Sequence, residues 1–461
     1  MKKTLYLCLE IKVRELLPKI YLSYLAAKKK FRIYLGSREE IFNLILNKEK
    51  KAGIFFYKAG LQKEMTDMID LKIDHHVVLD EEISPGFTKE QYKYRVLSFY
   101  REVIHKISLF FYVNKEIASI FKKQYPKVSS KKIFSTGWPR FEIIKKKNLK
   151  IFDKEVKIIK KKEKSFFLFI SDFSYTTKNY EVFAREYFAW GVKKNQKKKN
   201  IENQIQEAKF HYEDFKIVSN FLLEYARKNS SIKIIIRSHP NESFKEWEKI
   251  IKVAKVKNIK LTKPVDDVVP WIIASSGILH RGCTTSIQSS ILKKKIGYIN
   301  LGKHNKKNKF FKNFLYSISN PIRCEKDLDT WIKKKFCTKA QSRVNKKLRR
   351  LNILQNNDSA KNIVNILDKL AIKKEDRSII KKSNNNFYGI ISLYKSLVLR
   401  KLLIFSTKIG LLQRNIDRFN FTHKIPGGIS SKDVNYYLKM FKKKNDNMLA
   451  KKINDELVLI E

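Results

Sequence analysis

The chain has 461 residues, 43% of them hydrophobic, and its 99 Lys and Arg against 45 Asp and Glu give a formal net charge of +54. This apolar content excludes a disordered chain, and the length allows two domains and a tail. This charge would favour binding to nucleic acid or to an anionic membrane. The lysines are spread evenly along the chain, however, which is typical of compositional drift. No nucleic-acid-binding motif is present in the sequence.

Residues 1–143 alternate between apolar runs of strand length and amphipathic segments of helix length. The strand-like runs fall at residues 4–11, 31–37, 52–58, 75–84, 108–114 and 131–137, and the helix-like segments at 16–30, 38–48, 65–71 and 115–125. Strands that alternate with helices at this spacing favour a parallel, doubly wound sheet. We therefore expect a Rossmann-like domain over residues 1–143.

A second alternating series follows a charged segment at residues 144–164, which we interpret as an interdomain linker. Its strand-like runs fall at 166–172, 233–239, 258–263, 277–280 and 296–300, and its helix-like segments at 202–228, 243–255 and 286–294. We expect a second Rossmann-like domain over residues 165–338. The predicted fold class is α/β, with two Rossmann-like domains that face a cleft.

Residues 339–461 show helical patterns only, with Lys- and Asn-rich spacers, and predict a basic helical extension. Within it, Tyr388–Leu412 is apolar with interspersed lysine and arginine. This pattern suits an amphipathic helix on an anionic membrane surface. The alternative is a basic helix that packs back onto the protein.

The strand-like run at 234–236 ends in Arg237, Ser238 and His239, and Pro240 stops it because proline offers no N–H to a sheet. In an open α/β sheet, ligands bind outside the carboxyl ends of the strands. Arg237 and His239 are therefore candidate ligands of a phosphate group. A histidine that only stabilises a turn is the alternative.

The run at 277–280 ends in His280 and turns at Arg281-Gly282 before a hydroxyl-rich helix start at Thr284, Thr285 and Ser286. Free N–H groups at a helix N-terminus favour anions. We expect these residues and His280 to bind the phosphate of a nucleotide. The hydroxyls would also fit a simple helix cap, and both roles use the same geometry.

Asp80, Glu81 and Glu82 follow an apolar run in the first domain. Neighbouring carboxylates repel one another, which raises the pKa of at least one of them and suits it to act as a general base. The alternative is a solvated turn. Asp266-Asp267 reads as a helix start, so no acidic pair for a metal is evident in the second half.

Cys8, Cys283, Cys324 and Cys337 have neither metal-ligand nor CxxC spacing, which predicts reduced thiols and a cytoplasmic protein. The apolar run near the N-terminus is too short and too charged for a signal peptide. No stretch reaches the roughly 18 apolar residues of a transmembrane helix. Peripheral binding to the inner face of the cytoplasmic membrane remains open.

The blocks at residues 4–41, 77–84, 133–144 and 236–242, taken in order, resemble the bacterial surface carbohydrate biosynthesis protein family, over roughly residues 4–330. That family belongs with glycosyltransferases of the GT-B fold, which has two Rossmann-like domains. The chain is similar, more distantly, to bacterial sialyltransferases and Kdo transferases. Those enzymes use CMP-sugars and have an acidic motif that supplies the catalytic base, an HP motif and a Ser/Thr pair.

The resemblance implies roles for several residues. Glu81-Glu82 would fill the acidic motif, with Glu82 as the preferred base, and His239-Pro240 would be the HP motif. Thr284-Thr285 or Thr285-Ser286 would be the hydroxyl pair. The glycine expected after the acids is Ile83 here, which leaves the base open between Glu81 and Glu82.

The sequence thus predicts a metal-independent glycosyltransferase that needs no cofactor. It would move a sugar from a nucleotide-sugar, with CMP-sugar preferred, to a surface polysaccharide or glycolipid acceptor near an anionic membrane. A CDP-alditol-dependent glycerol- or ribitol-phosphate transferase of the teichoic-acid-polymerase type is the first alternative. A non-catalytic nucleic-acid or membrane-binding protein is the second, and its binding would weaken steeply as salt rises.

Overall fold

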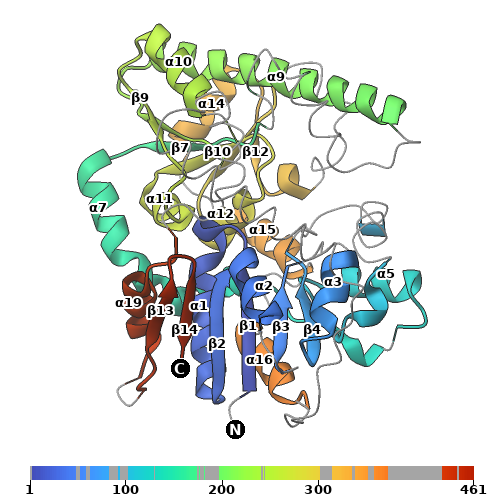
Figure 1. The fold of residues 1–461 in the computed structure, drawn as a ribbon. Helices are drawn as coiled ribbons and strands as arrows, with labels where there is room; N and C mark the ends of the chain where they lie inside the picture. The colour runs from blue at the N-terminus through green and yellow to red at the C-terminus, as the bar shows by residue number, and fades with distance from the viewer. Residues whose placement is uncertain are drawn as a thin grey trace, which may run out of the picture. The chain divides into compact units, whose positions relative to one another are not determined.

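The computed structural model describes residues 3–47, 52–58, 63–81, 92–93, 102–128, 130–173, 176, 181, 197–239, 242, 244–301, 314–334, 338–350, 358–371, 428–443 and 446–461. The chain forms two compact units. Unit 1 comprises Met1–Ile151 and Leu348–Glu461, and unit 2 comprises Phe152–Lys347. Each unit is built on a largely parallel sheet with helices between its strands (Figure 1). The predicted α/β class with two Rossmann-like units is confirmed.

Unit 1 contains an eight-stranded sheet of order β13-β14-β2-β1-β3-β4-β5-β6. Its parallel strands are β1 (Lys3–Leu9), β2 (Phe31–Ser37), β3 (Ile54–Tyr57), β4 (His75–Leu79), β5 (Leu109–Tyr112) and β6 (Ile133–Ser135). The intervening helices include α1 (Lys12–Lys28), α2 (Arg38–Leu46), α3 (Lys63–Asp70), α5 (Lys115–Gln124) and α6 (Pro139–Ile143). β1 and β3 are adjacent, so the direction of strand addition reverses between them.

Local sequence explains where these elements begin. The strands β3 and β5 are four-residue apolar runs, buried along their whole length, as strands of a sheet covered on both faces should be. Ser37 begins α2 by accepting a hydrogen bond from the Glu40 amide at 3.2 Å. Asn114 begins α5 in the same way, with 2.9 Å to the Ile117 amide.

The end of the chain returns to this sheet. β13 (Ala450–Asn454) and β14 (Leu457–Ile460) form a hairpin, and β14 pairs antiparallel with β2. In Figure 1 the red hairpin lies beside the blue strand β2. The prediction of helices only after residue 339 was therefore incomplete. The run Leu-Val-Leu-Ile at 457–460 is apolar and includes two β-branched residues, and its backbone pairs with the otherwise open edge of β2.

The remaining described part of the extension is helical, with α15 (Thr338–Arg350), α16 (Ser359–Asp368) and α19 (Ser431–Phe441). Both α16 and α19 pack on α1. The Tyr24 hydroxyl donates to the Asp446 carboxylate at 2.9 Å, and the rings of Tyr21 and Phe441 lie 4.9 Å apart. The segment Tyr388–Leu412, expected to lie on a membrane, falls outside the described residues.

Unit 2 contains a six-stranded, wholly parallel sheet of order β12-β11-β10-β7-β8-β9. Its strands are β7 (Phe167–Ile170), β8 (Ile234–Arg237), β9 (Ile259–Thr262), β10 (Gly277–His280), β11 (Ile296–Ile299) and β12 (Asn320–Ile322). Its helices include α7 (Asp153–Glu163), α9 (Lys197–Lys228), α10 (Phe244–Ala254), α11 (Val268–Ala274), α12 (Thr285–Ile291) and α14 (Glu325–Lys333). Counted within the unit, this is the 3-2-1-4-5-6 order of dinucleotide-binding folds.

An aromatic cluster forms the core of unit 2 on one face of its sheet. Trp247 of α10 is fully buried, 4.9 Å from the ring of Phe215 on α9 and 6.1 Å from that of Phe169 in β7. These contacts fix α9 and α10 against β7 and β8. The ends of those two strands are consequently held in place.

The expected linker at residues 144–164 has regular structure. A 3-10 helix covers Lys146–Phe152, and α7 follows it directly. Val156 and Ile159 of α7 are buried, and the helix packs on α11. Two apolar residues three positions apart lie on one helix face, which explains why this otherwise charged segment packs rather than extends.

Candidate functional site

In unit 2 the direction of strand addition reverses between β7 and β10, and in folds of this order ligands bind outside the carboxyl ends of the strands at that point. Asp172 follows β7, and Arg281 and Gly282 follow β10. Ser238 and His239 follow β8, the neighbour of β7. The topology thus gathers residues from three strand ends at one edge of the sheet.

Glu242 holds two of these ends together. Its buried carboxylate accepts hydrogen bonds from the Ser171 hydroxyl at 2.7 Å, from the Phe173 amide, and from the Trp247 indole at 3.1 Å. Burial raises the pKa of this carboxyl to about 8. Glu242 was not predicted from the sequence as a site residue, although its place three residues after His239 puts it in the same loop.

Arg281 is neutralised within unit 2. Its guanidinium pairs with the Asp214 carboxylate of α9, and its Nη1 lies 3.6 Å from Asp172 Oδ1. It also stacks over the ring of Phe173, 4.7 Å from the ring centre. Arg281 therefore ties α9 to the strand ends rather than adding an unbalanced positive charge.

Arg237 is also engaged. Its Nη1 lies 2.7 Å from Asp266 Oδ1, and its Nη2 donates to the Asp266 carbonyl. The side chain is 4% exposed. The Asp266 side chain, in contrast, is 53% exposed. Arg237 therefore already has a carboxylate partner in this structure, and a phosphate would have to compete with it.

His239 lies half-buried directly after this strand, and its carbonyl accepts from the Glu242 amide at 2.9 Å. Next to it, the Ser238 hydroxyl is buried without a hydrogen-bond partner among the described residues. Buried polar groups are normally satisfied, so this hydroxyl marks a place where a ligand or water can bind. Pro240 of the expected HP motif lies outside the described residues.

His280 differs from its expected role. It is fully buried in β10, and its Nε2 lies 2.9 Å from the Ser319 hydroxyl. Burial lowers the pKa of its imidazole to about 3. The side chain is therefore neutral near pH 7 and supplies no positive charge for a phosphate.

The predicted hydroxyl-rich helix start is α12. Thr284 is its N-cap residue, but its side chain makes no capping hydrogen bond. Thr285 accepts a hydrogen bond from the Cys283 thiol at 3.2 Å. Ser286 is fully buried and donates to the Cys283 carbonyl at 2.8 Å, so its hydroxyl stabilises the turn. Thr284 and Thr285 are partly exposed. Their role as ligands of a phosphate stays a prediction.

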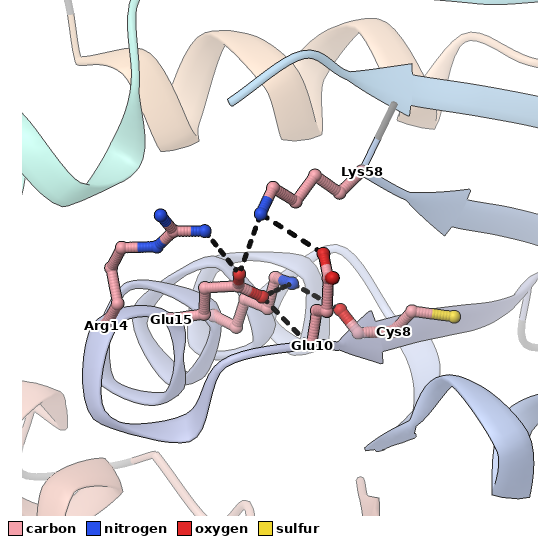
Figure 2. A network of polar contacts seen from close by, with 6 residues as sticks. Cys8, Glu10, Arg14, Glu15 and Lys58 are labelled. Carbon is pink, nitrogen blue, oxygen red and sulfur yellow. Dashed lines mark hydrogen bonds and ion pairs between the residues drawn. The ribbon is translucent and has the colours of Figure 1, made fainter. Parts of the chain in front are cut away.

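Unit 1 has its own reversal point between β1 and β3, and a charged network lies there (Figure 2). Glu10 follows β1, and Lys58 follows β3. The Lys58 ammonium lies 3.1 Å from Glu10 Oε2 and 3.6 Å from Glu15 Oε1. Figure 2 shows the side chains of Arg14, Glu15 and Lys58 converging on this point.

Glu15 is the centre of this network. Its buried carboxylate accepts from the Glu10 amide at 3.0 Å, from Lys19 at 2.7 Å and from Arg14 at 3.2 Å. Burial alone would raise its pKa, but Lys19, Lys58 and Arg14 outweigh burial and hold the pKa of this carboxyl well below its ordinary value. Lys19 also donates to the Cys8 carbonyl at the end of β1.

A small pocket of unit 1 joins this network to the predicted acidic motif. Eleven residues line it: Leu7, Glu15, Pro18, Lys19, Leu22, Phe56, Tyr57, Lys58, Leu79, Glu81 and Pro139. Its volume of 20 Å³ is enough for about one water molecule. Glu81 thus shares a pocket with Lys58, whereas Glu82 lies outside the described residues.

Sequence reasoning missed the network of Glu10, Glu15 and Lys58. A signal was present, because Glu10 and Lys58 each follow an apolar run directly. The carboxyl ends of parallel strands meet at one edge, so charges placed there can meet. Among the described residues no group of three or more His, Cys, Asp or Glu side chains is arranged to hold a metal ion.

No protein-family model and no curated protein sequence matches this chain. Solved structures resemble it at low identity. The wall teichoic acid polymerase TagF is 11% identical, with a TM-score of 0.49, over 80% of this chain and 88% of that chain. The UDP-GlcNAc 2-epimerase of Methanocaldococcus jannaschii, in complex with UDP-GlcNAc and UDP, is 13% identical with a TM-score of 0.47, over 80% and 99%.

A third structure, of Anabaena Alr3699/HepE in complex with UDP and glucose, is 8% identical with a TM-score of 0.40, over 80% of this chain and 100% of that chain. Likeness at this level does not identify a substrate. In the described part of the chain, no helix is both long and apolar enough to cross a membrane.

Proposed function

We propose that this protein is a glycosyltransferase that uses a nucleotide-sugar. The observation that carries the proposal is the strand order of the unit 2 sheet, which is typical of dinucleotide-binding folds and reverses between β7 and β10. Asp172 and Gly282 follow these two strands, and His239 follows β8, the neighbour of β7. The Ser238 hydroxyl beside His239, which is buried without a hydrogen-bond partner in the described part of the chain, supports a ligand there. His239, Thr284 and Thr285 are the proposed contacts of the donor phosphate.

Unit 1 would supply the acceptor side. An acceptor hydroxyl attacks the anomeric carbon of the donor sugar, the bond from that carbon to the phosphate oxygen breaks, and the nucleotide leaves. Glu81 or Glu82 takes the proton of the attacking hydroxyl as general base. The position of Glu81 in a pocket at the end of the unit 1 strands supports this role.

The finer parts of the proposal come from the sequence. We keep CMP-sugar as the preferred donor, a glycan or lipid-linked glycan near an anionic inner-membrane surface as the acceptor, and a reaction without metal or cofactor. A CDP-alditol-dependent transferase of the teichoic-acid-polymerase type remains the alternative within the enzymes. The two differ in the group transferred, a sugar or an alditol phosphate.

A thermal-shift screen of the purified protein against CMP, CDP, UDP, GDP and ADP tests the proposal, since a ligand of the folded state raises its melting temperature. A shift with CMP supports the CMP-sugar donor, and one with CDP supports the alditol alternative. Repeating the screen with EDTA tests metal independence. No shift with any nucleotide at low salt, together with salt-sensitive binding of RNA or anionic vesicles, would favour the non-catalytic alternative instead.

A further inference from the structure

Glu242 connects the ends of two neighbouring strands of the unit 2 sheet. Its backbone amide donates to the His239 carbonyl at 2.9 Å, beyond the end of β8. Its side chain reaches the end of β7, because one carboxyl oxygen, Oε1, accepts from both the Ser171 hydroxyl at 2.7 Å and the Phe173 amide. The position of His239 is therefore tied to the end of β7 through a single residue.

This connection begins where the pairing of the two strands stops. β7 and β8 pair along their length, and the Ser171 amide adds one more bond, to the Arg237 carbonyl at 3.0 Å. His239 lies two residues further on, half-buried, and the β7–β8 pairing does not include it. The Glu242 side chain supplies the contact with β7 at that point.

The protonation state of Glu242 suits a place beside a phosphate. Its side chain is buried, and burial raises the pKa of the carboxyl to about 8. The negative charge of Asp172, which lies between Ser171 and Phe173, raises the pKa further. Near pH 7 the carboxyl is therefore mostly protonated, and it can hold His239 in place without repelling an anionic donor.

We propose that Glu242 is a positioning residue for His239, which it holds where this histidine meets the donor phosphate. The inference rests on the proposed function, because it takes His239 as a contact of the donor. Trp247 of α10 orients the carboxyl from the core, since its indole donates to the second oxygen, Oε2, at 3.1 Å. Glu242 thus acts on the donor through His239 and not by direct contact.

The test is a calorimetric titration of the full-length protein and its variants with CMP, CDP and UDP. Glu242→Ala removes the connection, and we expect it to raise Kd by about tenfold, the effect of one lost hydrogen bond to a charged group. Ser171→Ala removes one of the two bonds to the β7 end and should raise Kd by about threefold. This milder variant keeps the test valid if Glu242→Ala does not fold.

Glu242→Gln separates the hydrogen bonds from the acid. Its side chain is neutral and its Oε1 can accept both bonds, so Kd should stay within about twofold of wild type. Its amide nitrogen would face the Trp247 N–H, which should lower the melting temperature instead. A Kd as high as that of Glu242→Ala would overturn the positioning role.

Ser275→Ala is the matched control. This serine is also buried and its hydroxyl also donates one hydrogen bond, to the Ile272 carbonyl at 2.9 Å, but it precedes β10 and lies away from the strand ends. It should bind nucleotide as wild type does. An equal rise of Kd in Ser275→Ala and Ser171→Ala would show a general loss of order and overturn the inference.

A double-mutant cycle tests whether the effect passes through His239. In a His239→Ala background, Glu242→Ala should raise Kd no further, because a positioning residue loses its effect with the group that it positions. Additive effects would overturn the inference, as would wild-type affinity in both Glu242→Ala and Ser171→Ala. An absence of binding by folded wild type to every probe would overturn the proposed function, and the inference with it.

Discussion

Lys58 and Glu15 meet across the carboxyl ends of β3 and β1, with 3.6 Å between Nζ and Oε1, and both side chains are almost fully buried. Lys19 approaches the same carboxylate at 2.7 Å. A buried network of this kind is stable only when every charge has a partner. It therefore fixes the two strand ends on which the proposed acceptor side depends.

Replacement of Glu15 by Gln should destabilise unit 1 by about 3 kcal/mol, because Lys19 and Lys58 would lose a buried counter-charge. Urea denaturation followed by fluorescence measures the change. Glu224→Gln is the matched control, since Glu224 forms an exposed pair with Arg227 and should contribute less than about 1 kcal/mol. Equal losses in the two variants would show that the network adds little.

The same carboxyl makes a prediction for pH. Because the folded-state pKa of Glu15 is lowered, its contribution is fully present above the ordinary value of 4.5 and is lost as pH falls below that value. The stability difference between wild type and Glu15→Gln should therefore shrink on acidification below about pH 4.5. A difference that stays constant from pH 7 to pH 3 would contradict the assigned shift.

His76 should destabilise the protein in acid. It is 1% exposed in β4, packs against the rings of Phe55 and Tyr57, and has two ring nitrogens without hydrogen-bond partners among the described residues. Burial lowers its pKa to about 3, so below pH 6.5 the unfolded chain binds a proton that the folded chain excludes. Stability therefore falls as pH drops from 6.5 toward 3.

His76→Phe removes this penalty and keeps the ring. We expect the variant to gain about 2 kcal/mol more over wild type at pH 5 than at pH 8, measured by denaturation at both values. His105→Gln at an exposed position is the control and should show no such difference. If the gain of His76→Phe is the same at both pH values, the imidazole is not buried as described.

Gly36 of β2 is needed for the docking of the C-terminal hairpin. A Cβ there would lie 2.6 Å from Leu457 Cδ1 and 2.9 Å from the Glu456 carbonyl oxygen. We expect Gly36→Ala to cost about 1–3 kcal/mol, because backbone must shift to accept it. In Gly282→Ala the nearest atom lies at 3.6 Å, so thermal denaturation without ligand should separate the two. Equal melting temperatures would contradict the close approach.

Sequence periodicity predicted the parallel strands that are short apolar runs buried on both faces, as the run at 234–236 illustrates. It missed β12, whose three residues Asn-Pro-Ile begin with an exposed asparagine. It did not predict that β14 pairs with β2. The turn at 455–456 directly before the run at 457–460 indicates pairing with the adjacent strand β13, and nothing in the sequence indicates β2 as the second partner. Edge pairing depends on which strand edge is left open, and only the folded unit decides that.

The candidate site, like the fold, includes features that the sequence predicts and features that only the folded structure decides. The positions of His239 after β8 and of the α12 start after β10 were predicted from the sequence, because each follows a short apolar run. The partners of the charged side chains were not predicted. Arg237 pairs with Asp266, and Glu15 with Lys58, because the fold brings them together, and their spacing in the sequence does not indicate either pair. The position of His280 inside its strand, one residue before the turn, decided that it is buried and neutral.

His239→Ala should weaken nucleotide binding by about tenfold, the loss of one hydrogen bond to a charged group, and should abolish turnover. The residue is half-buried beyond the end of β8, so the melting temperature without ligand should stay near that of wild type. Calorimetric titration and a product assay by mass spectrometry measure the two effects. Wild-type turnover in this variant would remove His239 from the mechanism.

The identity of the general base is tested by Glu81→Gln and Glu82→Gln. Loss of a general base lowers turnover by about 10²–10⁴-fold, while nucleotide affinity should stay unchanged, because the donor is proposed to bind unit 2. Glu81 is 8% exposed and shares a pocket with Lys58, so a fall in turnover confined to Glu81→Gln would assign the base to that pocket. A fall confined to Glu82→Gln would assign it to the residue that the resemblance prefers. Full activity in both variants would mean that the acceptor hydroxyl loses its proton elsewhere.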